Sequence, residues 1–301
     1  MNGNQVKVWL NAFRLRTLPL SVSGIITGSS LAFSVNQFDA LLFSLAILTV
    51  LFLQILSNLA NDLGDGLKGT DNANRVGPTR AIQSGKISVS AMKKAVILFA
   101  ILSLCTGIPL AYLGTQGLSV QMLYIFIGLA ILCVLAAISY TMGKKAYGYF
   151  GLGDVFVFLF FGILSVCGIF LLMTKQWMAE IILPASTIGL LSAAVLNLNN
   201  MRDLVNDKAS GKNTLVVRMG FSKAKLYHIF LIVTPLLLIT LFSYIIDSWG
   251  YLFSLSIYLI LIPHIIRVVQ CEDPKSLDPE LKKVALTTFL FSLIIATWVL
   301  I

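Results

Sequence analysis

The feature that most constrains this chain is a series of nine apolar runs, each about 20 residues long and separated by polar connections. A helix of that length crosses the roughly 30 Å hydrocarbon core of a bilayer. With 57% hydrophobic and 12% charged residues, the chain also has too little polar surface for a water-soluble globule. The sequence therefore predicts an all-α, polytopic membrane protein whose nine transmembrane helices cover residues 19–36, 40–60, 94–114, 120–141, 154–174, 178–198, 225–246, 249–269 and 284–301.

The lysine and arginine residues fall almost entirely on alternate connections. Of the 22, only Lys175 lies on the side opposite to the others. Because cytoplasmic loops carry such an excess, we expect a protein of the inner (cytoplasmic) membrane with its N-terminus in the cytoplasm and its C-terminus outside. This placement accounts for the net charge of +9 without a nucleic-acid partner. The four cysteines show no CxxC spacing and are interpreted as small core residues.

Two long connections, 61–93 and 199–224, hold most of the polar residues, and both fall on the predicted cytoplasmic side. Asp62 and Asp65 stand about one helical turn apart, as do Asp203 and Asp207, so each pair shares one face of a helix. Two carboxylates this close repel each other unless a cation lies between them. Because Mg²⁺ prefers carboxylate oxygens and substrate phosphates, the pattern predicts a magnesium site that faces the cytoplasm.

Amide and cationic side chains accompany these acids in both connections. A phosphate-bearing ligand would use both kinds of group, the carboxylates through Mg²⁺ and the cations directly. The alternative is that the acids and cations form ordinary helix caps and surface ion pairs. Six of the thirteen acids lie beside the cytoplasmic ends of predicted helices, which favours the ligand site. The accompanying residues are Asn58, Asn61, Asn200, Arg75, Arg80, Arg202, Lys212 and Arg218.

The two connections also resemble each other in composition and in their place after an apolar helix. This similarity indicates a distant internal repeat of two four-helix units followed by a ninth helix, within a single domain over residues 1–301.

Four stretches carry a family resemblance: NLANDLGDGLKGTD from Asn58, NNMRDLVNDKASGKNTLVVRMG from Asn199, the segment from Tyr140 to Asp154, and RTLP from Arg16. They resemble the UbiA-type intramembrane aromatic prenyltransferases, a family with nine helices and two Asp-rich motifs. Within that family they are most similar to the branch that acts on 1,4-dihydroxy-2-naphthoate in menaquinone biosynthesis. The first motif has Gly69 where the general pattern has a third Asp, and Asp71 takes that place.

The resemblance implies a Mg²⁺-dependent transfer of a polyprenyl group from its diphosphate to 1,4-dihydroxy-2-naphthoate, with loss of CO₂. It implies that Mg²⁺ is bound by Asp62, Asp65, Asp71, Asp203 and Asp207. It implies that Asn58, Asn61, Lys68, Arg75, Arg80, Arg202 and Lys212 bind the diphosphate. Tyr140, Tyr147 and Phe150 are candidates to stabilise an allylic cation, and Asp154 is a candidate to deprotonate a ring hydroxyl or to cap a helix.

Two alternatives stay open. One is a member of the same family that acts on another acceptor, such as 4-hydroxybenzoate or homogentisate. The other, from a different class, is a secondary transporter, although the acids cluster at one face and not at the midplane where transporters bind their substrates. The expected partners are the two substrates and the bilayer, with no obligatory protein partner. His228 and His264 each stand alone in an apolar run and are interpreted as structural.

Overall fold

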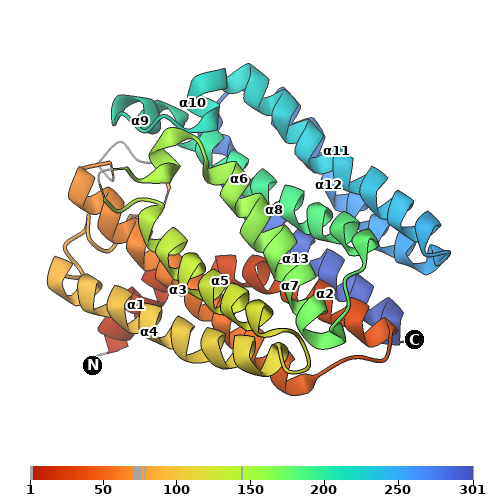
Figure 1. Ribbon diagram of the computed structural model, residues 1–301. Helices are drawn as coiled ribbons and strands as arrows, with labels where there is room; N and C mark the ends of the chain where they lie inside the picture. Colours follow the sequence, from red (N-terminus) through yellow and green to blue (C-terminus); the bar gives the residue numbers. More distant parts are fainter. Residues whose placement is uncertain (1–2, 71–75, 78, 144, 301) are drawn as a thin grey trace.

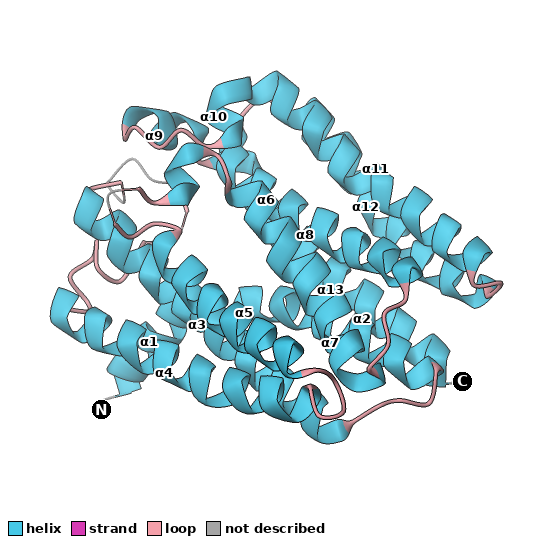
Figure 2. Cartoon of the chain, viewed as in Figure 1, coloured by secondary structure: helices cyan, strands magenta, loops and turns pink. Residues whose placement is uncertain are grey.

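The computed structural model describes residues 3–70, 76–77, 79–143 and 145–300, and over these residues the regular structure is entirely helical (Figures 1 and 2). The α-helices are α1 (Gly3–Phe13), α2 (Leu18–Ser34), α3 (Ala40–Lys68), α4 (Val89–Gly114), α5 (Val120–Ser139), α6 (Gly153–Val157), α7 (Ser165–Thr174), α8 (Ile182–Arg202), α9 (Leu204–Ala209), α10 (Leu215–Met219), α11 (Phe221–Ile245), α12 (Tyr258–Gln270) and α13 (Asp278–Leu300). Shorter 3-10 or π-helical segments are η1 (Leu15–Thr17), η2 (Tyr147–Phe150), η3 (Phe158–Leu164), η4 (Ala179–Ile181), η5 (Trp249–Ile257) and η6 (Pro274–Leu277).

Among the described residues, eight helices are long and apolar enough to cross a membrane. They correspond to eight of the nine predicted spans, and the predicted span 19–36 corresponds to α2, which has 17 residues and is not one of the eight. The polytopic, all-helical architecture is therefore confirmed, whereas the count of nine spanning helices stays a prediction.

The helices extend beyond the apolar runs at one side. At the predicted outer side the helix ends lie within two residues of the expected positions. At the predicted cytoplasmic side α3 continues to Lys68 and not to residue 60, and α8 continues to Arg202 and not to residue 198. Asp62 and Asp65 thus lie on the last turns of a helix and not in a loop. The reason is that hydropathy marks the depth of the bilayer, while a helix continues until its own end signals.

Those end signals are visible on α3. Asp39 caps its first turn, where the carboxylate accepts a hydrogen bond from the Leu42 N–H at 2.9 Å. At the other end Gly69 adopts a left-handed conformation with φ 72°, which glycine reaches without a Cβ clash, and its N–H bonds back to the carbonyls of Asp65 and Gly66. The helix that carries the first acidic motif is therefore delimited by local chemistry.

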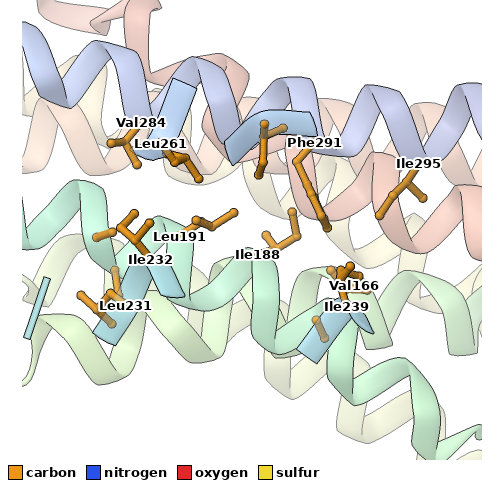
Figure 3. Packing of buried hydrophobic residues seen from close by; sticks show 14 of the residues in the cluster. Val166, Ile188, Leu191, Leu231, Ile232, Ile239, Leu261, Val284, Phe291 and Ile295 are labelled. Atoms are coloured by element: carbon orange, nitrogen blue, oxygen red, sulfur yellow. The ribbon is translucent and has the colours of Figure 1, made fainter. Parts of the chain in front are cut away.

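The main apolar core packs between α7, α8, α11, α12 and α13 (Figure 3). Ile188 and Leu191 on α8 are fully buried within this core, against residues such as Ile232 and Phe291. Gly162 and Gly189 allow η3 and α8 to approach closely, because a Cβ on Gly162 would lie 2.5 Å from the carbonyl oxygen of Ala185. A smaller core joins α1, α3, α4 and α5. The two cores leave a cavity between them, which is the setting of the site.

Candidate functional site

A cavity of about 390 Å³ runs between the two groups of helices. One stripe of α3 lines much of its length, with Ala46 and Asp65 as the first and last residues of the stripe. These two residues are about 28 Å apart along the helix axis, because an α-helix rises about 1.5 Å per residue. The end near Ala46 is apolar, and Leu110, Ile169 and Leu172 contribute to it. The end near Asp65 is polar, so the cavity suits a ligand with a long apolar tail and a charged head.

At the polar end two buried carboxylates face one buried ammonium group. The Nζ atom of Lys212 lies 3.7 Å from Oδ2 of Asp65 and 4.0 Å from Oδ1 of Asp207. Asp65 comes from α3 and Asp207 from α9, so the structure brings the two predicted acidic motifs together here. Burial alone would lower the pKa of Lys212, but the carboxylates of Asp65 and Asp207 outweigh this effect and raise the pKa, which keeps the ammonium charged.

Tyr149 is central to this arrangement and was not among the predicted site residues. Its hydroxyl donates to Oδ1 of Asp65 at 2.8 Å and lies 2.6 Å from the Thr70 hydroxyl. The Nζ atoms of Lys68 and Lys212 lie 4.1 and 5.5 Å from the centre of its ring. The signal in the sequence was its place between two other aromatic residues in the segment before Asp154, but nothing there indicated which ring meets the acids.

Tyr140 and Tyr147 line the cavity next to the polar end, as predicted for aromatic groups that face the substrate. Their rings meet edge to face with centroids 5.2 Å apart. Phe150, the third aromatic candidate, is 49% exposed and does not line the cavity.

Asp62 and Asn58 hold the polypeptide around the site. Both carboxylate oxygens of Asp62 accept backbone hydrogen bonds, from Ala81 at 3.1 Å and from Ile82 at 3.4 Å, which folds the segment after the first motif back onto α3. The Asn58 amide donates to the carbonyl of Phe13 at 2.9 Å and to the Thr17 hydroxyl at 3.1 Å. Asn58 lines the cavity, whereas Asp62 lies behind its wall.

Asp203 is bound by the neighbouring guanidinium of Arg202 through two contacts, at 2.9 and 2.6 Å. The same guanidinium reaches Asp278 at the start of α13 at 2.5 Å and Asn199 at 2.9 Å. Arg202 is buried and does not line the cavity. It thereby ties the second acidic motif to α13.

The remaining predicted residues divide between the cavity and its surroundings. Asn61 and Arg80 line the cavity. Asp154 is buried behind the wall and is hydrogen-bonded to Tyr227. Asn200 is also buried, and Arg218 donates to the carbonyl of Phe150 at 2.8 Å. Asp71 and Arg75 lie outside the described residues.

No three His, Cys, Asp or Glu side chains gather closely enough to hold a metal ion within the part of the chain that the structure describes. The donors present are nevertheless of the right kind. Asp65 and Asp207 are buried carboxylates from different helices that converge on one cation, and oxygen donors of this type suit a hard divalent ion. The metal role predicted for Asp62, Asp71 and Asp203 stays a prediction.

The two histidines do not stand alone, contrary to the expectation from their spacing. His228 and His264 are both fully buried, and their Nε2 atoms lie 2.8 Å apart between α11 and α12. Nδ1 of His264 lies 2.6 Å from Glu280 on α13, whose other oxygen accepts from Arg267 and Lys283. Residues 36 positions apart meet because α11 and α12 pack side by side, which spacing along the chain could not reveal.

The chain matches the model of the UbiA prenyltransferase family over residues 21–298. It is 42% identical to the 1,4-dihydroxy-2-naphthoate octaprenyltransferase of Haemophilus influenzae, over 100% of this chain and 98% of the relative. It is 41% identical to the enzyme of the same name from Escherichia coli, over 96% of this chain and 95% of the relative. Among solved structures it is similar to a UbiA homologue from Aeropyrum pernix, with a TM-score of 0.69 and 15% identity over 95% of this chain and 98% of that one. A UbiA homologue from Archaeoglobus fulgidus bound to GPP and Mg²⁺ gives a TM-score of 0.68 at 15% identity, over 96% of this chain and 99% of that one. The polar end of the cavity, its long apolar wall and this full-length similarity agree, and the chain belongs to the UbiA prenyltransferase family.

Proposed function

We propose that this protein transfers a polyprenyl group from polyprenyl diphosphate to 1,4-dihydroxy-2-naphthoate, with loss of CO₂, and so forms demethylmenaquinol in menaquinone biosynthesis. The observation that carries the proposal is the cavity, whose Asp65–Lys212–Asp207 cluster lies at one end of a long apolar wall. Near-full-length identity of 42% and 41% to two enzymes named for this acceptor supports the choice of substrate. Both relatives are named octaprenyltransferases.

In this proposal the diphosphate lies at the polar end and the tail lies along α3. The allylic C–O bond breaks and the electron pair leaves with the diphosphate. A new C–C bond forms at the ring carbon that bears the carboxylate, CO₂ leaves from that carbon, and the ring returns to the aromatic quinol. Atoms and charge balance without an added oxidant or proton.

The protein contributes to this reaction by stabilising charge and by excluding water. The ammonium of Lys212 is held at the polar end by two carboxylates and offers a fixed positive charge to the departing diphosphate. The rings of Tyr140 and Tyr147 face the cavity where positive charge develops on the allyl group. Apolar side chains along the wall keep water from the allylic cation.

A divalent cation, Mg²⁺ in this proposal, would neutralise the charge of the diphosphate. Asp65 and Asp207 are the residues best placed to hold it, because both are buried and face the same point. Solved structures of UbiA homologues from Archaeoglobus fulgidus bound to Mg²⁺ with DMAPP or GPP support this proposal. We further propose Asp62, Asp71 and Asp203 as metal ligands.

Other parts of the proposal concern the remaining site residues. Asn58, Asn61, Lys68, Arg75, Arg80 and Arg202 are proposed to contact or orient the diphosphate. Asp154 is proposed to help deprotonate a ring hydroxyl of the acceptor.

The chain is an integral membrane protein, as its family and the eight candidate spanning helices among its described residues require. We propose that it lies in the inner membrane of a bacterium, with the N-terminus and the polar end of the cavity facing the cytoplasm. The single-domain organisation with a repeat of two four-helix units also stays a proposal.

The test uses the purified protein in detergent or lipid. 1,4-Dihydroxy-2-naphthoate and a polyprenyl diphosphate are supplied with Mg²⁺ or with EDTA, and demethylmenaquinone and CO₂ are measured by mass spectrometry. We expect both products with Mg²⁺ and neither with EDTA. Product with 4-hydroxybenzoate or homogentisate alone would move the enzyme to another pathway. The absence of product with every acceptor, in a folded sample, would refute the proposed function.

A further inference from the structure

Two cations at the cavity are not explained by the donor site. Arg16 on η1 and Lys282 on α13 both line the cavity, and both are exposed. Among the described residues neither side chain has a hydrogen bond or an ion pair. Lys212 and Arg202, in contrast, are each held by two carboxylates.

The cavity offers Arg16 and Lys282 no acidic partner of its own. Asp65 is the one carboxylate among the described residues that line it, and Asp65 is already bound by Tyr149 and Lys212. Two positive groups left facing a cavity in this way form a site for an anion that the protein does not supply. That anion has to come with a ligand.

The position of Arg16 is built into the fold. Arg14 holds a left-handed conformation with φ 52° just before η1, a conformation that residues other than glycine rarely adopt. The turn persists because Asn58 binds both the Phe13 carbonyl and the Thr17 hydroxyl. Asn58 is seven residues before Asp65 on α3, about 10 Å away along the helix axis. The turn with Arg16 is therefore anchored at a different level of the cavity from the cluster around Asp65.

The position of Lys282 is equally determined. The start of α13 is held by the ion pair between Asp278 and Arg202, at 2.5 Å, and Arg202 also binds Asp203. Two residues further on, Glu280 is held by His264 and by the cations Arg267 and Lys283. Lys282 lies between these anchored positions and Ala285 on the same helix, and both Lys282 and Ala285 line the cavity.

We infer that Arg16 and Lys282 bind the carboxylate of the aromatic acceptor and so select an aromatic acid over an uncharged ring. This inference rests on the proposed function. The diphosphate is assigned to the level of Asp65, where Lys212 lies between Asp65 and Asp207. When the acceptor's carboxylate is bound by Arg16 and Lys282, its aromatic ring lies between that carboxylate and the diphosphate. Hydrogen bonds between ionised partners are about twice as strong as neutral ones, but the exposure of Arg16 and Lys282 weakens them.

The test measures steady-state kinetics of Arg16→Gln, Lys282→Gln and the double variant in detergent. We expect KM for 1,4-dihydroxy-2-naphthoate to rise about fivefold in each single variant and more in the double variant. KM for the polyprenyl diphosphate is expected to change less than twofold. Lys275→Gln is the matched control, because Lys275 is exposed on η6 just before α13 and does not line the cavity.

A second measurement avoids turnover. Binding of 1-hydroxy-2-naphthoate, which keeps the carboxylate, and of 1-naphthol, which lacks it, is followed by quenching of tryptophan fluorescence. The wild type is expected to prefer the acid, and the double variant is expected to lose this preference while it still binds naphthol. An unchanged preference, or a rise in KM for the diphosphate and not for the acceptor, would overturn the inference. If the wild type turns over no acceptor at all, the proposed function fails instead, and the binding preference still tests the carboxylate site.

Discussion

Removal of the positive charge at Lys212 tests the polar end of the cavity most directly. In Lys212→Met, the carboxylates of Asp65 and Asp207 lose the buried ammonium that lies 3.7 and 4.0 Å from them. At an effective dielectric constant of about 20, each of these attractions amounts to about 4 kcal/mol, and the burial of the ammonium offsets much of the sum. Removal of one partner from a buried ion pair typically costs about 3–5 kcal/mol.

The variant is therefore expected to unfold roughly 10 °C below the wild type in EDTA, measured by differential scanning fluorimetry in detergent. Mg²⁺ should recover part of this loss in the variant and have a smaller effect on the wild type, because a divalent ion can take the position of the ammonium and stabilises only the folded state. Prenyl transfer should fall by about 100-fold. The exposed Lys223 on α11 provides the control substitution Lys223→Met, which should change neither quantity.

The pH dependence of this contribution also follows. The pKa of Lys212 is raised above the ordinary value of 10.5, so the stability that the ammonium provides is fully present below that value and is lost only as the pH rises through the raised pKa. The difference in Tm between wild type and Lys212→Met should thus be constant between about pH 6 and pH 9. Equal Tm values for the two proteins in EDTA would refute the stabilising role of Lys212 between Asp65 and Asp207.

Four further substitutions test other contacts. Tyr149→Phe removes the hydroxyl that binds Asp65 and Thr70 but keeps the ring near Lys68. We expect kcat to fall about tenfold and the free energy of unfolding to fall by about 1 kcal/mol. A kcat equal to that of the wild type would contradict the role of the hydroxyl. Asp62→Ala and Asp203→Ala should each abolish turnover while circular dichroism still reports a helical protein, and full activity in either would count against the proposed metal site. Lys175→Ala should keep full turnover, because Lys175 lies on the side opposite to the other cations. It should lower Tm slightly, because the Lys175 ammonium donates to the carbonyls of Gly114 and Leu172. A loss of activity would argue against the proposed topology.

The helices of this protein could be located from hydropathy because the bilayer imposes a length on each apolar run. Hydropathy misplaces the site relative to the helices, because it does not indicate where a helix ends once the helix extends beyond the apolar region. The apolar runs put Asp62, Asp65 and Lys68 in a connection, yet these residues lie on α3, where their mutual geometry is rigid. The acidic pairs were recognisable because residues three or four apart share a helical face.

Contacts between segments that are distant in the sequence could not be predicted from the sequence. Tyr149 meets Asp65 only because η2 packs against the end of α3, and no spacing along the chain encodes that meeting. The pair His228–His264 and the contact between Arg202 and Asp278 are of the same kind. Chemistry that depends on one helix was predictable, whereas chemistry shared between helices required the fold.

The π-helical segment η3 interrupts the helix that runs from α6 to α7, and it has a consequence for the shape of the cavity wall. Phe156, Phe160, Leu164, Gly168 and Leu172 all line the cavity at intervals of four residues. In an uninterrupted α-helix each such interval overshoots a full turn by about 40°, so four intervals would rotate the last residue about 160° from the first. The wider turn of η3 absorbs much of this rotation and keeps the two halves in phase. Because a π-helical turn holds about one residue more than an α-helical turn, the extra length of η3 is what keeps these side chains along one wall, so the length of this segment, and not only its composition, shapes the binding surface.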